Sequence, residues 1–391
     1  MGQERSESAI AWPGVFAIVA IMLMGSARAF AQNAAPPELP PRAEILSLAE
    51  KAADWQLEDL AAAQADETRA YHPRGWEQGA FWVGFTRLAE MTGEARYLDA
   101  VMRQGEANRW QLGSMPYFAD DHVIGQTYLW AAENGAGAEV LEPLQEEFDR
   151  ILAHPPKVHL SFVIPGEAYL ETPCLKRWCW CDALFMGPPT WLGLSRVTSN
   201  PAYAEFALEE FRAATAFLYD EEEQLYFRDS RFFERRDDEG RKLFWARGNG
   251  WVLAGLANML REMPEDDPAR AEIETLFTQM ARRLIALQKP DGYRPPSLLA
   301  PEGSPPESSG TGFFVYGLAW GVNHGLLTEE EAGPAIRMGW IALERAVAED
   351  GRVGWVQPVS DRPDTVSASD THFYGTGAFL LAATEVAALA R

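Results

Sequence analysis

The chain has 391 residues, of which 47% are hydrophobic and 23% are charged, a composition typical of one large or two small globular domains rather than of a disordered protein. Asp and Glu (57 residues) outnumber Lys and Arg (34), and the net charge of −23 argues against a nucleic-acid partner because it repels phosphate. Fourteen Trp and eleven Tyr residues exceed the needs of a core, and such rings are the usual stacking surface for sugars and other amphipathic ligands.

The first 31 residues have the pattern of an export signal. A polar start that carries Arg5 is followed by the apolar stretch 15–24 and by small residues at 29–31. The apolar run is shorter than the roughly 20 residues that cross a bilayer, which disfavours a membrane anchor. We therefore expect a signal peptide over 1–31, a Pro-rich leader over 32–42, a single large domain over 43–391, and a periplasmic or secreted mature protein.

From residue 43 onward, apolar residues recur at helical spacing, and no stretch shows sustained period-two alternation. In chain order, amphipathic helices are expected to alternate with apolar, glycine-rich helices. The amphipathic helices are predicted over 43–63, 95–109, 141–152, 201–218, 269–288 and 329–348. The apolar helices are predicted over 82–88, 125–132, 191–197, 250–260, 312–321 and 375–386.

A repeated motif supports this alternation. Residues 82–88 (WVGFTRL) and 191–197 (WLGLSRV) agree in pattern at every position. A helix that is apolar on every side must be buried on every side, so six such helices inside six amphipathic ones predict an all-α fold, a closed (α/α)6 toroid. The alternative is an open solenoid of helical hairpins, whose repeats are more regular in length and lack long aromatic loops.

The loops that precede the apolar helices are rich in Trp, Asp, Arg and Gly. In a toroid the inner helices all begin at one mouth, so we expect these loops to line one pocket. They are 73–76, 120–122, 178–182, 245–251, 308–312 and 369–374.

Three cysteines, Cys174, Cys179 and Cys181, lie in or near one of these loops and cannot form complete pairs. One local disulfide remains possible in an oxidising compartment. Their spacing matches no ordinary zinc site, the six His residues are scattered, and no nucleotide-binding or nucleophile-elbow motif is present. The sequence therefore predicts neither a metal site nor a cofactor.

Two acidic positions are candidates for acid–base chemistry. Asp182 directly precedes a predicted helix and has two interpretations, a helix N-cap or a general acid whose pKa is raised by the aromatic residues Trp178 and Trp180. The pair Asp120–Asp121 also precedes a helix and is equally open to both interpretations. Two carboxyls that face one pocket are what glycosidic chemistry needs.

Arg247 lies between Trp245 and Trp251, with glycines around it. It is interpreted either as an ion pair with one of the many acids or as a planar fork for a substrate carboxylate. His122 and His372 are isolated, which is more typical of structural or hydrogen-bonding roles than of metal ligation.

The segments 178–189 (WCWCDALFMGPP), 245–251 (WARGNGW), 307–312 (ESSGTG) and 374–381 (YGTGAFLL) occur in this order. Together they resemble the unsaturated uronyl hydrolases of glycoside hydrolase families 88 and 105, with the closer likeness to the unsaturated rhamnogalacturonyl hydrolases of family 105. The likeness runs from about residue 43 to residue 389. It implies an (α/α)6 catalytic domain without a metal or organic cofactor, whose partner is a small oligosaccharide with a terminal uronate.

The resemblance also assigns roles to residues. Asp182 is implied as general acid and base, with Trp180 beside it, and Asp121, in preference to Asp120, falls on the second acid. The motif formed by Trp245, Arg247 and Trp251 is implied to contact the sugar, with Arg247 on the uronate carboxylate. The complete set of residues expected to bind substrate is Trp76, Asp120, His122, Trp180, Arg228, Trp245, Arg247 and Trp251.

One position departs from the family pattern. Arg228 stands where the family commonly has His, so the substrate preference of relatives is not expected to transfer directly. The long charged loop 231–242 that follows is expected to be mostly solvated.

The implied activity is removal of a 4,5-unsaturated galacturonyl or glucuronyl residue from the non-reducing end of lyase-generated oligosaccharides, by hydration of the double bond. The alternatives are an ordinary glucuronidase or a polysaccharide lyase on the same toroid, and a non-catalytic sugar-binding protein.

Overall fold

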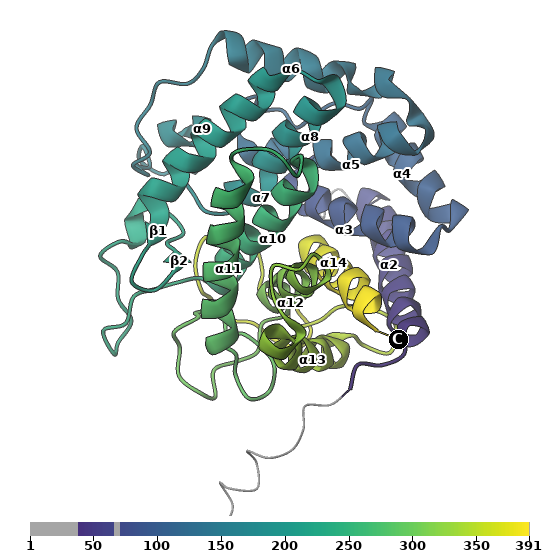
Figure 1. Ribbon diagram of the computed structural model, residues 1–391, viewed down its shortest axis with the longest axis vertical. Helices are drawn as coiled ribbons and strands as arrows, with labels where there is room; N and C mark the ends of the chain where they lie inside the picture. Colours follow the sequence, from purple (N-terminus) through teal and green to yellow (C-terminus); the bar gives the residue numbers. More distant parts are fainter. Residues whose placement is uncertain (1–37, 66–70, 391) are drawn as a thin grey trace, which may run out of the picture. The chain divides into compact units, whose positions relative to one another are not determined.

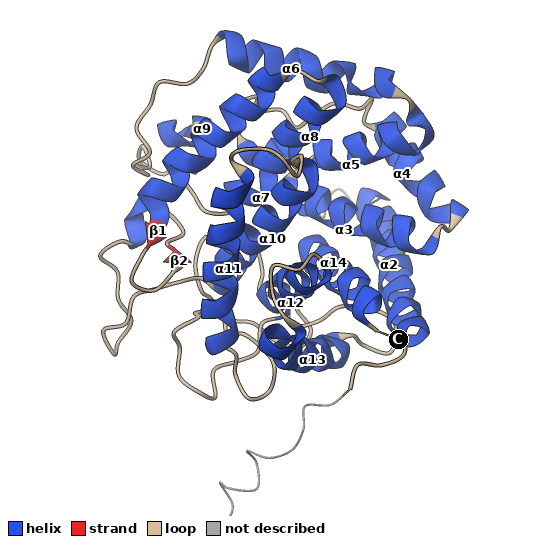
Figure 2. Ribbon diagram, viewed as in Figure 1, coloured by secondary structure: helices blue, strands red, loops and turns tan. Residues whose placement is uncertain are grey.

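The chain alternates between helices and loops from residue 42 onward (Figures 1 and 2). This computed structural model describes residues 38–65 and 71–390. The expected signal peptide over 1–31, and the expected leader up to residue 37, lie outside the described residues. None of the described helices has the length and apolar character needed to cross a membrane.

Outer and inner helices alternate along the chain and form two layers (Figure 1). The outer helices are α2 (Arg42–Ala65), α4 (Ala95–Ala107), α6 (Glu142–Ala153), α9 (Pro201–Leu218), α11 (Arg270–Ala286) and α13 (Glu329–Ala346). The inner helices are α3 (Trp76–Thr92), α5 (Ile124–Ala131), α7 (Ala183–Met186) with α8 (Pro188–Thr198), α10 (Ala246–Glu262), α12 (Ser308–Asn323) and α14 (Phe373–Leu389). Strands β1 (Tyr219–Asp220) and β2 (Leu225–Tyr226) form a short antiparallel hairpin after α9.

The inner helices form a closed ring. Each packs on the next in the order α3, α5, α8, α10, α12 and α14, and α14 packs back on α3. Glycines permit this last contact, because a Cβ added at Gly84 of α3 would lie 2.3 Å from the carbonyl oxygen of Gly377 of α14. A closed ring excludes the open solenoid and confirms the (α/α)6 toroid.

One inner element differs from its prediction. The helix expected over 191–197 is preceded by a separate turn, α7, and the two are divided at Gly187 because Pro188 starts α8 and cannot continue a helix. The ring of Trp178 packs on Gly187 so closely that a Cβ there would lie 2.8 Å from it. This break lets the chain carry Asp182 to the mouth of the ring.

The interior of the ring is filled by side chains. Tyr316 of α12 donates a hydrogen bond to Asn258 of α10 (2.6 Å), whose side-chain amide donates to Gln126 of α5 (3.1 Å). Gln126 in turn donates to the carbonyl of Phe185 in α7 (2.9 Å). The inner helices are therefore joined by polar contacts across a core that is otherwise apolar.

At the far end of the ring, where the inner helices finish, charged side chains pair across helices. Arg261 of α10 lies 3.3 Å from Glu385 of α14, which also accepts a hydrogen bond from Asn323 of α12 (2.7 Å). Arg196 of α8 pairs with Glu262 of α10 at 2.9 Å. These contacts join four inner helices at this end.

Candidate active site

A cavity of about 350 Å³ lies at the mouth where the inner helices begin. Four of the six predicted loops contribute to it, those before α3, α5, α7 and α10, while the predicted loop 369–374 does not and residues 359–361 of the same connection line the cavity instead. The loop before α12 does not, because Glu307 is buried there and caps α12 through the N–H groups of Ser309 and Gly310. The lining residues are Trp76, Phe118, Asp120, Tyr169, Leu170, Trp180, Asp182, Met186, Arg228, Trp245, Val359, Ser360 and Asp361.

Asp182 lies in the cavity wall with 8% of its surface exposed. Its side chain makes no capping hydrogen bond to α7, and its backbone is already helical (φ −58°, ψ −33°), so it is not a conventional N-cap. Burial raises the pKa of Asp182, while the positive charges of Arg228 and Arg247 oppose the rise. A carboxyl with a raised pKa in an aromatic wall is suited to proton donation.

The two adjacent acids, Asp120 and Asp121, have different surroundings. Asp120 lines the cavity, and its Oδ1 is buried without a hydrogen-bond partner. Burial and then the negative charge of Asp182 raise the pKa of Asp120 well above its ordinary value. Asp121 turns away into its own loop, where its Oδ2 accepts the N–H of Met115 at 2.7 Å, and it does not line the cavity.

Burial also raises the pKa of Asp121, to about 6, with hydrogen bonds from its loop opposing the rise. Both acids therefore have a raised pKa, and they differ in whether the side chain lines the cavity. The structure brings Asp120, rather than the preferred Asp121, to the same space as Asp182.

Arg228 is the only cationic side chain among the described residues that line the cavity. It follows β2, and its Nε lies 3.5 Å from Oδ2 of Asp182 without forming a hydrogen bond to any described group. Its backbone carbonyl accepts the N–H of Cys181 (2.9 Å), which ties it to the segment that carries Asp182. The position where this chain departs from the family pattern is thus beside the candidate acid.

Arg247 does not reach the cavity. Its side chain is fully buried, and its two terminal nitrogens donate to the carbonyls of Gln357 (2.6 Å) and Pro358 (3.0 Å). The guanidinium is held between the rings of Trp245 and Tyr374, at 4.5 and 4.6 Å from their centroids. In this arrangement Arg247 supports the loop at 357–358, and its Nε is buried without a hydrogen-bond partner.

Three of the expected tryptophans line the cavity. Trp180 stacks on Phe118 at 5.2 Å between ring centroids, Trp76 stacks on Tyr374 at the same distance, and Trp245 donates its indole N–H to Gln357 (3.0 Å). Trp251 is buried behind them, 4.2 Å from the ring of Phe313, and supports the wall rather than forming it.

Both isolated histidines are structural in this arrangement. His122 is buried, with one ring nitrogen 2.7 Å from the carbonyl of Pro116 and the other accepting the indole N–H of Trp191 (3.3 Å). Burial lowers the pKa of His122 to about 4, so it is neutral at physiological pH. His372 stacks on Tyr374 outside the cavity lining.

The sequence alone did not identify several cavity residues. Tyr169 and Leu170 come from the long loop between α6 and α7, and Val359, Ser360 and Asp361 come from the loop between α13 and α14. Neither loop has a periodic pattern, so the sequence carried no signal for them apart from the aromatic ring of Tyr169.

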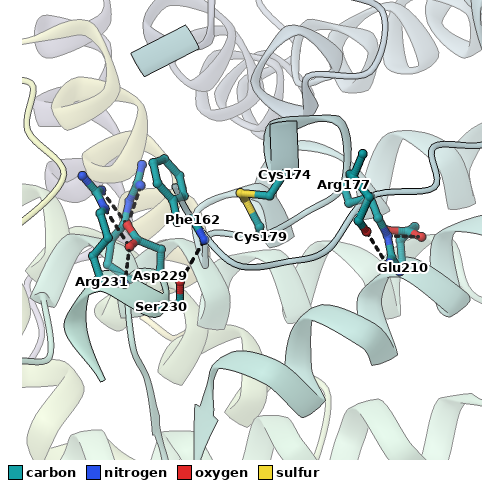
Figure 3. The surroundings of a disulfide bond; sticks show 10 residues. Phe162, Cys174, Arg177, Cys179, Glu210, Asp229, Ser230 and Arg231 are labelled. Atoms are coloured by element: carbon teal, nitrogen blue, oxygen red, sulfur yellow. Dashed lines mark hydrogen bonds and ion pairs between the residues drawn. A yellow bond between two sulfur atoms is a disulfide. The ribbon is translucent and has the colours of Figure 1, made fainter. Parts of the chain in front are cut away.

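The first of these loops is held by a disulfide between Cys174 and Cys179, while Cys181 is free and buried (Figure 3). Arg177 between the two cysteines is also fixed, because its Nε donates to Glu210 of α9 at 2.9 Å. The local bridge left open by the sequence is therefore present, immediately before Trp180 and Asp182.

No group of three or more His, Cys, Asp or Glu side chains in the described part of the chain is arranged to hold a metal ion. The cavity is lined by the carboxyls of Asp120, Asp182 and Asp361, one guanidinium and several aromatic rings. Buried carboxyls in an aromatic pocket at the mouth of an (α/α)6 toroid are the arrangement that the chemistry of a glycoside hydrolase needs.

Comparison with known proteins gives the particular family. A family model described as glycosyl hydrolase family 88 matches residues 48–390, so the chain belongs to this family and is a glycoside hydrolase. Of the two families that the sequence resembles, it is thus family 88 whose model matches.

Three relatives illustrate the similarity. An unsaturated 3S-rhamnoglycuronyl hydrolase from Alteromonas sp. (strain LOR) is 42% identical over 349 residues, 87% of this chain and 84% of the relative. A solved glycosyl hydrolase family 88 protein from Bacteroides vulgatus superposes with a TM-score of 0.77 at 28% identity, covering 89% of this chain and 99% of that one. A solved protein described as a polysaccharide lyase superposes with the same TM-score at 30% identity, covering 89% and 98%.

Proposed function

We propose that this glycoside hydrolase removes a 4,5-unsaturated uronic acid from the non-reducing end of oligosaccharides that a polysaccharide lyase has produced. The observation that carries the proposal is the facing pair Asp182 and Asp120, both with raised pKa values, beside Arg228 in one aromatic cavity. The name of the Alteromonas relative supports an unsaturated uronyl residue linked to a rhamnose-type sugar as the first substrate to test.

The chemistry begins with a proton. Asp182 donates it to C4 of the unsaturated sugar, and as the resulting carboxylate it accepts a proton from a water molecule that adds to C5. The ring of the new hemiketal opens to a ketone at C5, the hemiacetal at C1 collapses to an aldehyde, and the aglycone leaves with a proton. This route needs one well-placed acid in a site shielded from bulk water, and no enzyme nucleophile.

Asp120 is assigned as the second acid. Burial and then the negative charge of Asp182 raise the pKa of Asp120, so Asp120 keeps its proton to a higher pH than an ordinary carboxyl does. Asp120 therefore helps to keep a proton available in the cavity after Asp182 has lost its own.

Arg228 is assigned as the partner of the substrate carboxylate. Both arginines have an Nε without a hydrogen-bond partner, but only the side chain of Arg228 lines the cavity, whereas Arg247 lies outside the lining with its terminal nitrogens on the carbonyls of Gln357 and Pro358. A planar guanidinium forms strong charge-assisted hydrogen bonds with carboxylates. The aromatic walls formed by Trp76, Trp180 and Trp245 would stack on the sugar ring.

The test is an absorbance assay. Purified protein is incubated with lyase-generated unsaturated disaccharides, first one with a rhamnose aglycone, then ones from rhamnogalacturonan and glucuronan. The ultraviolet absorbance of the double bond is followed while released sugars are separated by chromatography. Loss of absorbance with release of the aglycone is expected.

The solved structure described as a polysaccharide lyase makes lyase activity the second candidate. A lyase creates the double bond, so a gain of absorbance on the intact polysaccharide, with no loss on disaccharides, would replace the proposal. Hydrolysis of saturated uronides would indicate an ordinary glucuronidase, and binding without turnover would indicate a sugar-binding protein.

We also propose that the protein is exported. The disulfide between Cys174 and Cys179 supports an oxidising compartment, in agreement with the signal pattern over 1–31. N-terminal sequencing of protein from the periplasm or medium is expected to begin near residue 32. An intact N-terminus on cytoplasmic protein would contradict export.

A further inference from the structure

Asp229 is completely buried, and the proposed function gives it no role. It directly follows Arg228 and begins a short helical turn, η7 (Ser230–Phe232), whose Arg231 N–H it accepts at 2.9 Å. A buried carboxylate is costly unless it is paired and hydrogen-bonded, so its partners indicate why it is there.

The carboxylate of Asp229 holds two arginines at once (Figure 3). Its Oδ2 accepts from Nη1 of Arg228 (2.8 Å) and from Nη2 of Arg231 (2.7 Å), while its Oδ1 accepts from Nε of Arg231 (2.8 Å). Although burial alone would raise the pKa of Asp229, the hydrogen bonds from Arg231 and the charge of Arg228 lower it. Asp229 is therefore a permanent anion between two cations.

The contacts continue to the rim of the cavity. Nη2 of Arg231 also donates to Oδ2 of Asp361, a cavity-lining residue of the loop between α13 and α14 (2.7 Å). The guanidinium of Arg231 rests on the ring of Phe162, 4.2 Å from its centroid, in the loop that carries the disulfide. Three separate loops thus meet at Arg231.

This arrangement determines which edge of Arg228 faces the cavity. With Nη1 held by Asp229, the Nε edge points toward Asp182 at 3.5 Å, a distance longer than a charge-assisted hydrogen bond. The two groups are already within ion-pair distance, and if Asp229 released it, Arg228 could turn and form a direct hydrogen bond to Asp182. The carboxylate of Asp182 would then be stabilised, and the guanidinium would be less free for the substrate.

We infer that Asp229, together with Arg231 and Asp361, is a positioning unit that holds Arg228 toward the substrate carboxylate and prevents it from neutralising the general acid. This inference rests on the proposed function. The residues that it adds contact Arg228 and the rim of the cavity, and they do not contact the reacting atoms of the substrate.

The pH dependence of Asp182 involves every charged or titratable group that faces it. These groups are Asp120 before α5, Tyr169 in the disulfide loop, the adjacent thiol of Cys181, Arg228 after β2, and Arg247 in α10. Only Arg228 among them is in direct contact with Asp229, so a change at Asp229 acts on Asp182 mainly through Arg228.

The experiment compares Asp229→Asn with Asp237→Asn. Asp237 lies in the same charged loop, is partly exposed and accepts from Nε of Arg241 (2.6 Å), so the control removes the carboxylate partner of one arginine away from the cavity. Asp229→Asn is expected to move the alkaline limb of the kcat profile to lower pH by about one unit, since a new hydrogen bond from a cation lowers the pKa of a carboxyl. It is also expected to raise KM roughly tenfold through a misplaced Arg228. Asp237→Asn should behave as the unchanged enzyme.

A second measurement separates this inference from the proposed function. Binding of free glucuronate, which has no double bond to hydrate, is measured by calorimetry and is expected to weaken roughly tenfold in Asp229→Asn. This result would support the positioning unit even if the unchanged enzyme processed no unsaturated disaccharide. An unshifted profile and unchanged glucuronate affinity would overturn it.

If Asp229→Asn does not fold, Asp361→Ala removes only the outer contact of the unit. It is expected to show a smaller shift in the same direction, and an identical profile to the unchanged enzyme would overturn the inference.

Discussion

Asp182 is predicted to be dispensable for the fold and essential for the reaction. Asp182→Asn should lower kcat by about 10²- to 10⁴-fold, the usual contribution of a general acid–base group. A carboxyl with a raised pKa binds more protons in the folded than in the unfolded protein, so its presence lowers stability as pH rises above its ordinary value. The free energy of unfolding of Asp182→Asn at pH 7 to 8 should therefore be equal to or above that of the unchanged protein, as measured by urea titration. A large loss of stability with activity retained would mark Asp182 as a structural residue.

Asp120 and Asp121 are predicted to respond differently to the same substitution. Asp120→Asn removes a group that faces Asp182 and should reduce kcat/KM by about 10²-fold or more. Asp121→Asn serves as its control, because the amide oxygen can still accept the N–H of Met115, and it should retain most activity and stability. The reverse result in steady-state assays would return the second acid to Asp121.

These two acids also show a limit of prediction from sequence, which could not decide which of the two carboxyls lines the cavity. The presence of an acidic pair before an inner helix was evident, but η2 (Ala119–His122) is a tight helical turn in which neighbouring side chains diverge by about 120°. Which of the two carboxyls faces the cavity depends on the rotation of that turn. Arg247 failed to reach the cavity for a related reason, since it lies in the first turn of α10 and its side chain is enclosed between Trp245 and Tyr374.

Among the structural elements, the inner helices were the more predictable. Their glycine-rich, all-round apolar pattern can only be satisfied by burial on every side, which is a property of the sequence. The cavity loops have no such constraint, so their contribution depends on tertiary contacts such as those of Arg231, which is fixed between Asp229 and Asp361. The expectation of a mostly solvated loop over 231–242 is correct for the charged residues at 234–236 and 238–239, which are exposed, but not for Arg231.

The contact between α3 and α14 is predicted to be sensitive to a single methyl group. Gly84→Ala places a Cβ against the carbonyl of Gly377, which cannot move without displacing a helix, and should lower the free energy of unfolding by about 1 to 3 kcal/mol. Gly333→Ala in α13 is the matched control, because the three atoms nearest to its Cβ belong to the ends of the flexible side chains of Glu329 and Arg337, which can move aside. Equal melting temperatures for the two variants would contradict a backbone contact that closes the ring.

For the whole molecule, the charged pairs at the far end of the ring are predicted to affect stability and not catalysis. Glu385→Gln weakens the contact with Arg261 and should lower the free energy of unfolding by roughly 1 to 3 kcal/mol. Glu329→Gln, at the exposed pair with Arg337 on α13, should cost less than about 1 kcal/mol. Because Glu385 follows the first residue of α14, Phe373, by twelve positions, the network lies about 18 Å from the mouth, and kcat at 25 °C should be unchanged in both variants. A change in kcat for Glu385→Gln would show that the far end influences the cavity.

The filled interior of the ring determines how substrate and products enter and leave the cavity. Tyr316, Asn258 and Gln126 join the inner helices across the centre, so a sugar that enters the cavity cannot pass through to the far end. In the proposed reaction, substrate and both products share the entrance, with the uronate innermost and the aglycone nearer to solvent. The aglycone then departs first, and the keto acid left behind is expected to compete with the next substrate, so that a chain is shortened by one sugar per encounter and never threaded.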